Sequence, residues 1–212
     1  MNLNYNYTTT IGFSTGLEFD FETIKFKSDS TLYYLFNDSE ILSKSQYVNS
    51  ENIFKNSEGK VYQITARKEK PIYLSIPAMI LFRTEFIGYF RYFGKFGLRN
   101  SFLISSKTTD DGSIPAIGQN ITNVDMISKN DLFFFKSAVG VAAGAEWNFS
   151  GSTSLVAEIG YYYGFTPLHT QKKTDAGDER NTLFTIDDNG DPLMFNNKAN
   201  QNQVMLKVSI LF

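Results

Sequence analysis

The chain has 212 residues, enough for one domain, and carries a formal net charge of −2 with a pI near 5.5. This balance gives no reason to expect a nucleic-acid partner, and the absence of cysteine excludes disulfides, thiolate metal clusters and thiol nucleophiles. Although 16% of the residues are aromatic, no stretch approaches the roughly 18 consecutive apolar residues of a membrane-spanning helix.

Residues 3–21 alternate between apolar side chains at odd positions and polar or small side chains at even positions. A period of two is typical of a β-strand with one apolar and one polar face. One strand of this length would be roughly 60 Å long, whereas a tilted transmembrane strand needs only about 9–11 residues. A turn at residues 8–10 would divide the segment. Because three β-branched threonines make a poor turn, we expect one long strand.

The same alternation recurs along the chain and predicts further strands. Their ranges are 24–36, 72–83, 88–106, 132–149, 153–165 and 203–212, with a short piece at 61–66. Pro77 lies inside one of them and predicts a bulge or a local sheet edge, because proline has no N–H to donate. The connections at 22–23, 84–87 and 150–152 are short, and those at 37–71, 107–130 and 166–201 are long and polar.

Short turns on the periplasmic side and long external loops are typical of transmembrane β-barrels. The sequence therefore predicts an all-β fold, an antiparallel up-and-down barrel that crosses a Gram-negative outer membrane many times. Seven strands can be counted, but bacterial barrels normally have an even number. We expect eight, in a single domain over 1–212 whose first strand is either missing or supplied by residues 2–7. No signal peptide follows Met1, so we expect a mature or truncated chain.

A soluble β-sandwich is the alternative, and in it the aromatic faces of the strands would form a core. In the barrel they face lipid, and some form a girdle at the periplasmic rim. The expected girdle residues are Phe19, Phe21, Phe82, Phe90, Trp147 and Phe149. The terminal Phe212 resembles the signal that barrel-assembly machinery reads.

Charged residues on the polar faces would point into the barrel lumen. They are Glu18, Asp20, Arg91, Lys95, Arg99, Lys136, Glu146, Glu158 and Lys207. The lumen of an eight-stranded barrel is just wide enough for side chains to fill it, and unpaired buried charge is costly. We expect a salt-bridged polar plug. An ion or proton path, or a catalytic pair of Glu146 and Glu158, is the alternative. The turn at 150–152 would place Glu158 opposite Gly144.

Two other features of the sequence are candidate sites. His169 is the single histidine, and in a long loop we expect it to be solvated. Asp187, Asn189 and Asp191 are spaced like the start of a calcium loop, but Pro192 stands after them and an ordinary turn fits better. We therefore expect no catalytic residue, no metal site and no cofactor.

Two segments carry a family resemblance. Residues 72–98, IYLSIPAMILFRTEFIGYFRYFGKFGL, and residues 139–165 resemble the outer-membrane β-barrel domain common in Bacteroidetes, the PorT-like group of porin-family proteins. Members often show a Tyr-Leu-Glu-Ile-Pro strand, here with Ser75 in place of Glu, and a Thr-x-x-Ile-Gly-Tyr stretch, here starting at Thr84. The resemblance covers about two-thirds of the chain. It implies the fold and the membrane, no catalytic residues, and for some members a role in secretion or assembly complexes.

We expect a non-enzymatic structural or accessory subunit of an envelope complex for secretion, assembly or uptake. Its partners would be the lipid bilayer, the barrel-assembly machinery during insertion, and other outer-membrane proteins or lipoproteins. Apolar residues in the long loops either pack within those loops or dock a partner. They are Tyr47, Ile53, Phe54, Ile121, Met126, Leu183, Phe184 and Phe195. A small-solute channel would need an open lumen, and a barrel hydrolase would need a nucleophile constellation that the sequence does not display.

Overall fold

The computed structural model describes residues 2–26, 31–37, 40–41, 61–126, 132–169, 183–188, 192–194 and 199–211. Within these ranges the protein consists of β-strands, turns and bends. No helix there is long and apolar enough to span a membrane. The prediction of an antiparallel all-β fold is confirmed, because every strand pair that joins the sheet is antiparallel.

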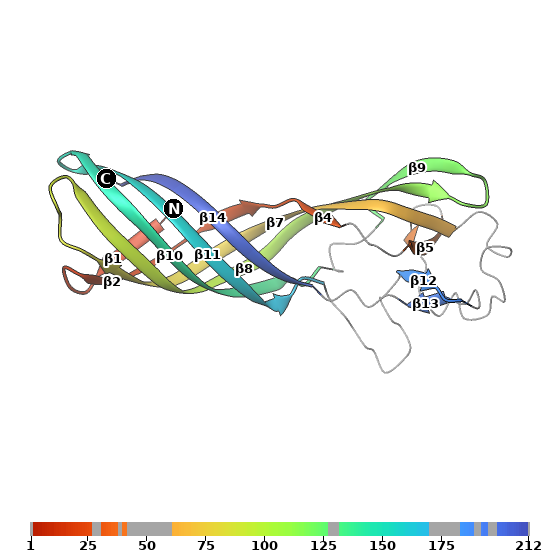
Figure 1. Ribbon diagram of the computed structural model, residues 1–212, viewed down its shortest axis with the longest axis horizontal. Coiled ribbons are helices and arrows are strands. Elements are labelled where there is room, and N and C mark those ends of the chain that lie inside the picture. The colour runs from red at the N-terminus through yellow and green to blue at the C-terminus, as the bar shows by residue number, and fades with distance from the viewer. Residues whose placement is uncertain are drawn as a thin grey trace.

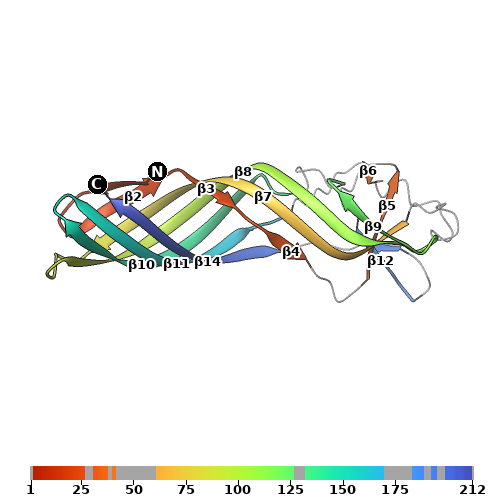
Figure 2. The same cartoon turned by 90° about the horizontal axis from the view of Figure 1, so that it is seen from above.

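The strands follow one another in a meander around a common axis (Figures 1 and 2). Their bounds are β1 (Asn2–Asn6), β2 (Ile11–Gly16), β3 (Glu18–Phe21), β4 (Ile24–Phe26), β5 (Leu32–Asn37), β6 (Glu40–Ile41), β7 (Val61–Arg83), β8 (Phe90–Ile114), β9 (Gln119–Val124), β10 (Phe135–Ser150), β11 (Thr153–Pro167), β12 (Phe184–Ile186), β13 (Pro192–Met194) and β14 (Asn200–Leu211). β7, β8, β10, β11 and β14 are neighbours in this order, and β2, β3 and β4 pair with the other side of β7.

The single long strand expected over residues 3–21 is wrong, because a threonine turn divides it into β1 and β2. The Thr8 hydroxyl accepts a hydrogen bond from the Ile11 amide at 2.9 Å, and the Tyr7 amide donates to the Ile11 carbonyl at 3.0 Å. This side-chain bond stabilises a turn that backbone propensity alone disfavours. Residues 2–6 then pair back on residues 12–16 with Leu3 opposite Thr15.

The reversal expected at residues 22–23 is also wrong. β2, β3 and β4 follow one another in the same direction along β7 and together form the first strand path, with Phe13 opposite Ile80 and Ile24 opposite Glu69. The path is interrupted twice, between β2 and β3 and between β3 and β4. Each interruption lies opposite a proline of β7, Pro77 and Pro71 respectively. Since proline cannot donate a ladder hydrogen bond, the breaks in the first path follow from the sequence of β7.

β7 and β8 have 23 and 25 residues, far more than the roughly 9–11 residues with which a tilted strand crosses a membrane. Part of the polar connections expected over 37–71 and 107–130 is therefore strand. β8 carries exposed apolar side chains from Phe90 to Ile104 and polar ones from Ser105 onward. β7 and β8 thus cross an apolar band, and Figures 1 and 2 show both strands continuing beyond the ends of β10, β11 and β14.

The outer surface of the barrel is apolar and its interior is polar, the inverse of a soluble protein. The exposed apolar side chains of this band include Ile11, Phe13, Leu17, Ile80, Phe82, Phe96, Leu98, Phe102, Val141, Ile159, Tyr161, Tyr163, Phe165, Val204, Leu206, Val208 and Ile210. A continuous exposed band of this kind is the lipid-facing surface of a transmembrane barrel. The alternative of a soluble sandwich, which requires these residues to be buried, is wrong.

The ends of β7 and β8 beyond the band form, together with β5 and β9, a small folded unit that we term the head. Its apolar core contains Leu32, Tyr34, Tyr62, Ile64, Ile114 and Leu183, with Ile121 and Met126 packed against it. Phe184 is buried in a second cluster beside Leu35 and Val61. Four of the apolar loop residues therefore pack internally, while Tyr47, Ile53, Phe54 and Phe195 lie outside the described residues.

A buried ion pair ties β7 to β8 at the base of the head. Arg67 Nε and Nη2 donate to Asp110 Oδ1 and Oδ2 at 2.7 and 2.9 Å, a two-pronged arrangement that is among the strongest side-chain pairings. Above it, the Tyr62 hydroxyl lies 2.5 Å from the Ile121 carbonyl oxygen and 3.0 Å from that of Asp110. These contacts fix the β9 hairpin to the long strands.

The two edges of the barrel sheet are β1 and β14, and no ladder joins them within the described residues. The expected number of eight strands therefore stays a prediction. The short turns lie together at the end remote from the head: the β1–β2 turn, the turn after β7 and the turn after β10. The beginning of β2 lies at this end, since Ile11 is opposite Phe82. The expectation that residue 21 lies there was wrong, because Phe21 is opposite Ile72.

Tyr62 makes the head less stable at alkaline pH. Burial, and then the negative charges of Asp110 and Asp111, raise the pKa of Tyr62 from 10.0 to about 12. Because the folded head prefers the neutral phenol, its stabilisation is complete below pH 10 and is lost as pH rises from about 10 to about 12. We expect the absorbance titration at 295 nm to show one tyrosine near 12 that Tyr62→Phe removes. A Tyr62 that titrates near 10 would contradict the buried hydrogen bond.

Candidate functional site

Charged side chains from five strands meet inside the barrel. Strand alternation directs Glu18, Asp20 and Glu22 inward from the first path, and strand register places their partners at the same depth. Arg91 lies opposite Glu146, and Glu158 lies opposite both Gly144 and Lys207. The expected pairing of Glu158 with Gly144 is thus confirmed.

Arg99 is the centre of this cluster and only 3% of its side chain is exposed. Its Nη1 lies 2.5 Å from Glu18 Oε2, and its Nη2 lies 2.6 Å from Asp20 Oδ1. Glu18 also pairs with Lys207 of β14, and Asp20 accepts a hydrogen bond from Ser75. One guanidinium therefore joins β8 to β3, and through Glu18 to β14.

Three further ion pairs extend the cluster along the barrel axis. Toward the short turns, Lys95 Nζ lies 2.5 Å from Glu158 Oε2 and Arg91 Nη2 lies 2.5 Å from Glu146 Oε2. Toward the head, Lys136 Nζ lies 2.5 Å from Glu22 Oε1. All nine residues expected in the lumen therefore take part in ion pairs, and every pair is at least three-quarters buried.

Glu22 is a member of the cluster that the sequence analysis missed. Besides Lys136 it accepts hydrogen bonds from Gln201 Nε2 at 3.0 Å and from Gln203 Nε2 at 2.7 Å. The sequence predicts a turn at this residue, yet the even positions from Gly12 to Phe26 are less exposed than their odd neighbours across residue 22. In the sequence the polar even positions continue to Glu22 and then give way to Ile24 and Phe26, so the local pattern does not distinguish a turn from a continuous path.

Aromatic rings and methylene chains fill the space between the charges. The Lys136 ammonium lies 4.0 Å from the centre of the Tyr73 ring, and the Arg99 guanidinium lies 5.6 Å from that of Tyr162. The Tyr162 ring covers Gly140 so closely that a Cβ there would lie 2.2 Å from it. Glycine is therefore required at this position for the ring to lie flat across the lumen.

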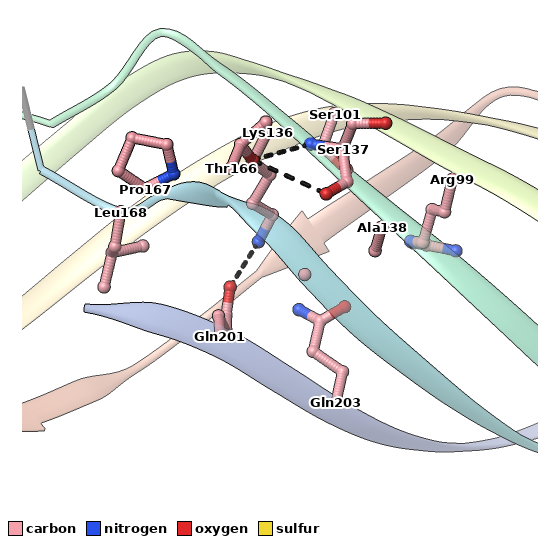
Figure 3. A pocket seen from close by; sticks show the side chains of 11 residues that line it. Arg99, Ser101, Lys136, Ser137, Ala138, Thr166, Pro167, Leu168, Gln201 and Gln203 are labelled. Atoms are coloured by element: carbon pink, nitrogen blue, oxygen red, sulfur yellow. Dashed lines mark hydrogen bonds between the residues drawn. The ribbon is translucent and has the colours of Figure 1, made fainter.

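The cavities that remain between these side chains are small. One, lined by Lys136, Thr166 and Gln201 among others, has a volume of about 20 Å³ and is drawn in Figure 3. Another, beside Arg99 and Glu158, measures about 10 Å³. A single water needs about 10–15 Å³ of such volume. Each cavity thus holds one water at most.

The residues considered for catalysis or metal binding have other partners. Glu146 and Glu158 each bind a separate cation, Arg91 and Lys95. His169 is not solvated as expected, because its Nε2 lies 3.3 Å from Glu69 Oε2 and 15% of its side chain is exposed. No group of three or more His, Asp or Glu residues that could hold a metal occurs in the described ranges. Of the calcium-like motif, Asn189 and Asp191 lie outside these ranges.

Four of the six residues expected in the aromatic girdle lie near the short turns, and two do not. Phe82, Phe90, Trp147 and Phe149 are exposed near the short turns, with the Phe90 and Trp147 rings stacked at 6.3 Å. Phe19 and Phe21 do not belong with them, because they lie opposite Leu74 and Ile72, farther along β7 toward the head. Their assignment followed from the incorrect turn at 22–23. Phe212 lies outside the described residues.

An apolar outer band, an inner row of paired charges and short turns at one end define a transmembrane β-barrel of the outer-membrane type. Residues 2–170 match the family described as outer membrane protein beta-barrel domain, and the chain belongs to this family. The family points to the outer membrane as the location of the protein. No curated protein and no solved structure gives a significant match to the chain.

Replacing Arg99 tests the central ion pairs. Arg99→Gln leaves Glu18 and Asp20 short of a buried counter-charge, and breaking such a pair typically costs about 3–5 kcal/mol. We expect the urea concentration at which half of the refolded barrel is unfolded to fall sharply. Heat-modifiable gel migration measures the folded fraction. Lys107→Gln is the matched control, because Lys107 is 61% exposed and lies 4.0 Å from Asp125. Exposed pairs contribute about 0–1 kcal/mol. Equal midpoints for the two variants would contradict a stabilising network.

Proposed function

We propose that the protein is a non-enzymatic and non-conducting barrel that serves as an accessory subunit of an envelope complex. In this proposal the barrel anchors the chain as a multi-pass protein of a Gram-negative outer membrane, and the head meets the partner. Secretion, assembly and uptake complexes are the candidates. The resemblance of residues 72–98 to PorT-like proteins of Bacteroidetes favours the same class.

The filled lumen carries the proposal. A conducting pore needs a continuous column of water, and the inner charges are instead bound to one another at about 2.5 Å with residual cavities of about 10 and 20 Å³. Ion pairs that span the lumen stiffen the barrel, and each of the nine expected lumen charges is held by a partner rather than free to bind a passing solute. The same arrangement argues against catalysis, because the carboxylates are held by Arg and Lys partners.

The head supports the binding role. It stands beyond the apolar band on two long strands, has its own aromatic core and is braced by the Arg67–Asp110 pair. Ile117 and Val124 of the β8–β9 hairpin remain exposed on it, by 60% and 49%. Exposed apolar side chains on a rigid support are typical of protein-binding surfaces. The partner we propose is another outer-membrane protein or a lipoprotein.

Conductance in planar bilayers tests the closed lumen. We expect the wild-type protein to give no steady steps above the lipid baseline. The positive control is the variant Arg99→Ser with Tyr162→Ser and Asp20→Asn. It should conduct, because it removes two large buried side chains that contact each other in the middle of the lumen. Stable ohmic steps from the wild-type protein would instead favour a small-solute channel.

Affinity purification from the native outer membrane in mild detergent tests the accessory role. We expect one stoichiometric membrane partner, and we expect Ile117→Asp to lose it because a charge at the hairpin would have to be desolvated. Lys107→Gln, an exposed change elsewhere on β8, should retain the partner. Recovery of the protein as a lone monomer, or equal capture by Ile117→Asp, would contradict docking through the head.

A further inference from the structure

A cavity of about 560 Å³ lies at the end of the barrel remote from the head. Its walls are the β1–β2 turn and the turn between β7 and β8, which Figure 1 shows at the same end of the molecule. Binding sites for small molecules typically measure about 300–1,000 Å³. The cavity is therefore of ligand size, unlike the spaces inside the lumen.

Arg83, the last residue of β7, forms part of this cavity and has no ion pair of its own among the described residues; the negative charge of Glu146 acts on it, but Glu146 is bound to Arg91. The Arg83 Nε is buried with no hydrogen-bond partner in the described part of the chain. The other inward cations of the barrel, such as Arg91 with Glu146 and Lys95 with Glu158, are all matched. A buried donor without an acceptor is unfavourable, so an acceptor from outside the chain would complete this site.

The other charges at the cavity leave Arg83 dominant. Arg91 is bound to Glu146, and its guanidinium also stacks on the Phe86 ring at 4.6 Å. Glu85 lines the cavity but is exposed to water, which weakens its field. Arg83 is thus the cavity cation without an ion pair among the described residues, and it faces a space flanked by threonine hydroxyls and an aromatic ring. This arrangement suits one negative charge rather than two.

We propose that this cavity binds a singly charged oxyanion, a phosphodiester or a carboxylate, with Arg83 as its principal contact. A guanidinium presents parallel N–H donors that match two oxygens of such a group. Arg83 follows the exposed Phe82 and lies opposite Phe93, three residues along β8 from the exposed Phe90, which pairs with the exposed Trp147. Aromatic rings of this kind mark the headgroup region of a bilayer. The anion is then either the phosphodiester of a phospholipid headgroup or a soluble anion of the same chemistry.

Two measurements on the purified full chain distinguish the sources. In detergent without phosphate, dimethyl phosphate or acetate is added at constant ionic strength, and unfolding is followed by the fluorescence of Trp147. Separately, protein in phosphatidylglycerol nanodiscs is released and weighed by native mass spectrometry. We expect either a thermal midpoint raised by the soluble anion or one retained phospholipid per barrel. Both effects should be absent in Arg83→Gln.

Controls separate binding from folding. Arg83→Gln removes an unmatched charge, so without anion it should unfold at or above the wild-type midpoint. Lys70→Gln removes an exposed positive charge outside the cavity and should behave as wild type. Arg83→Lys retains the charge but not the planar fork and should weaken binding at least about fivefold, which keeps the test valid if Arg83→Gln fails to fold. A midpoint and lipid count that are the same in wild type and both Arg83 variants would overturn the proposal.

Discussion

The double ion pair of Arg99 with Glu18 and Asp20 is the contact on which the interior of the barrel depends. It links β8 to β3, which lie on opposite sides of β7, and Glu18 forms a second ion pair with Lys207 of β14. Among the described residues no backbone ladder joins the two sides of the sheet, and these side chains link them. Because a buried charge without its partner is costly, each of these carboxylates fixes the position of the strand that carries its cation.

β7 passes through two surroundings, water around the head and lipid around the barrel. In the head its inward residues are apolar or aromatic, such as Tyr62 and Ile64, because water surrounds the head. In the barrel its inward residues include the polar Ser75, because lipid surrounds the barrel. A register shift between Ile64 and Ala66 changes which alternate positions face inward. The bulge therefore lets one strand keep a filled interior on both sides of the membrane boundary.

Much of the barrel could be predicted from alternation alone, since period two fixes both the strand and the face of each residue. The inward charges followed from it directly. The full length of β7 could not, because the bulge near residue 65 breaks the alternation and makes 61–66 look like a separate piece. The turn at residues 8–10 depends on one Thr8 hydroxyl, and the position of Glu22 depends on prolines in another strand. Such long-range and side-chain effects carry no local signal.

The distance along the chain between the partners of the lumen has a consequence for assembly. Glu18 and Lys207 are 189 residues apart, and Glu22 and Gln203 are 181 apart. Contacts of such sequence separation form late in folding. Until β14 is in place, two carboxylates of the first strand path remain wet and incompletely matched. The ion pairs and hydrogen bonds of Glu18 and Glu22 in the lumen are therefore complete only in a barrel that includes β14.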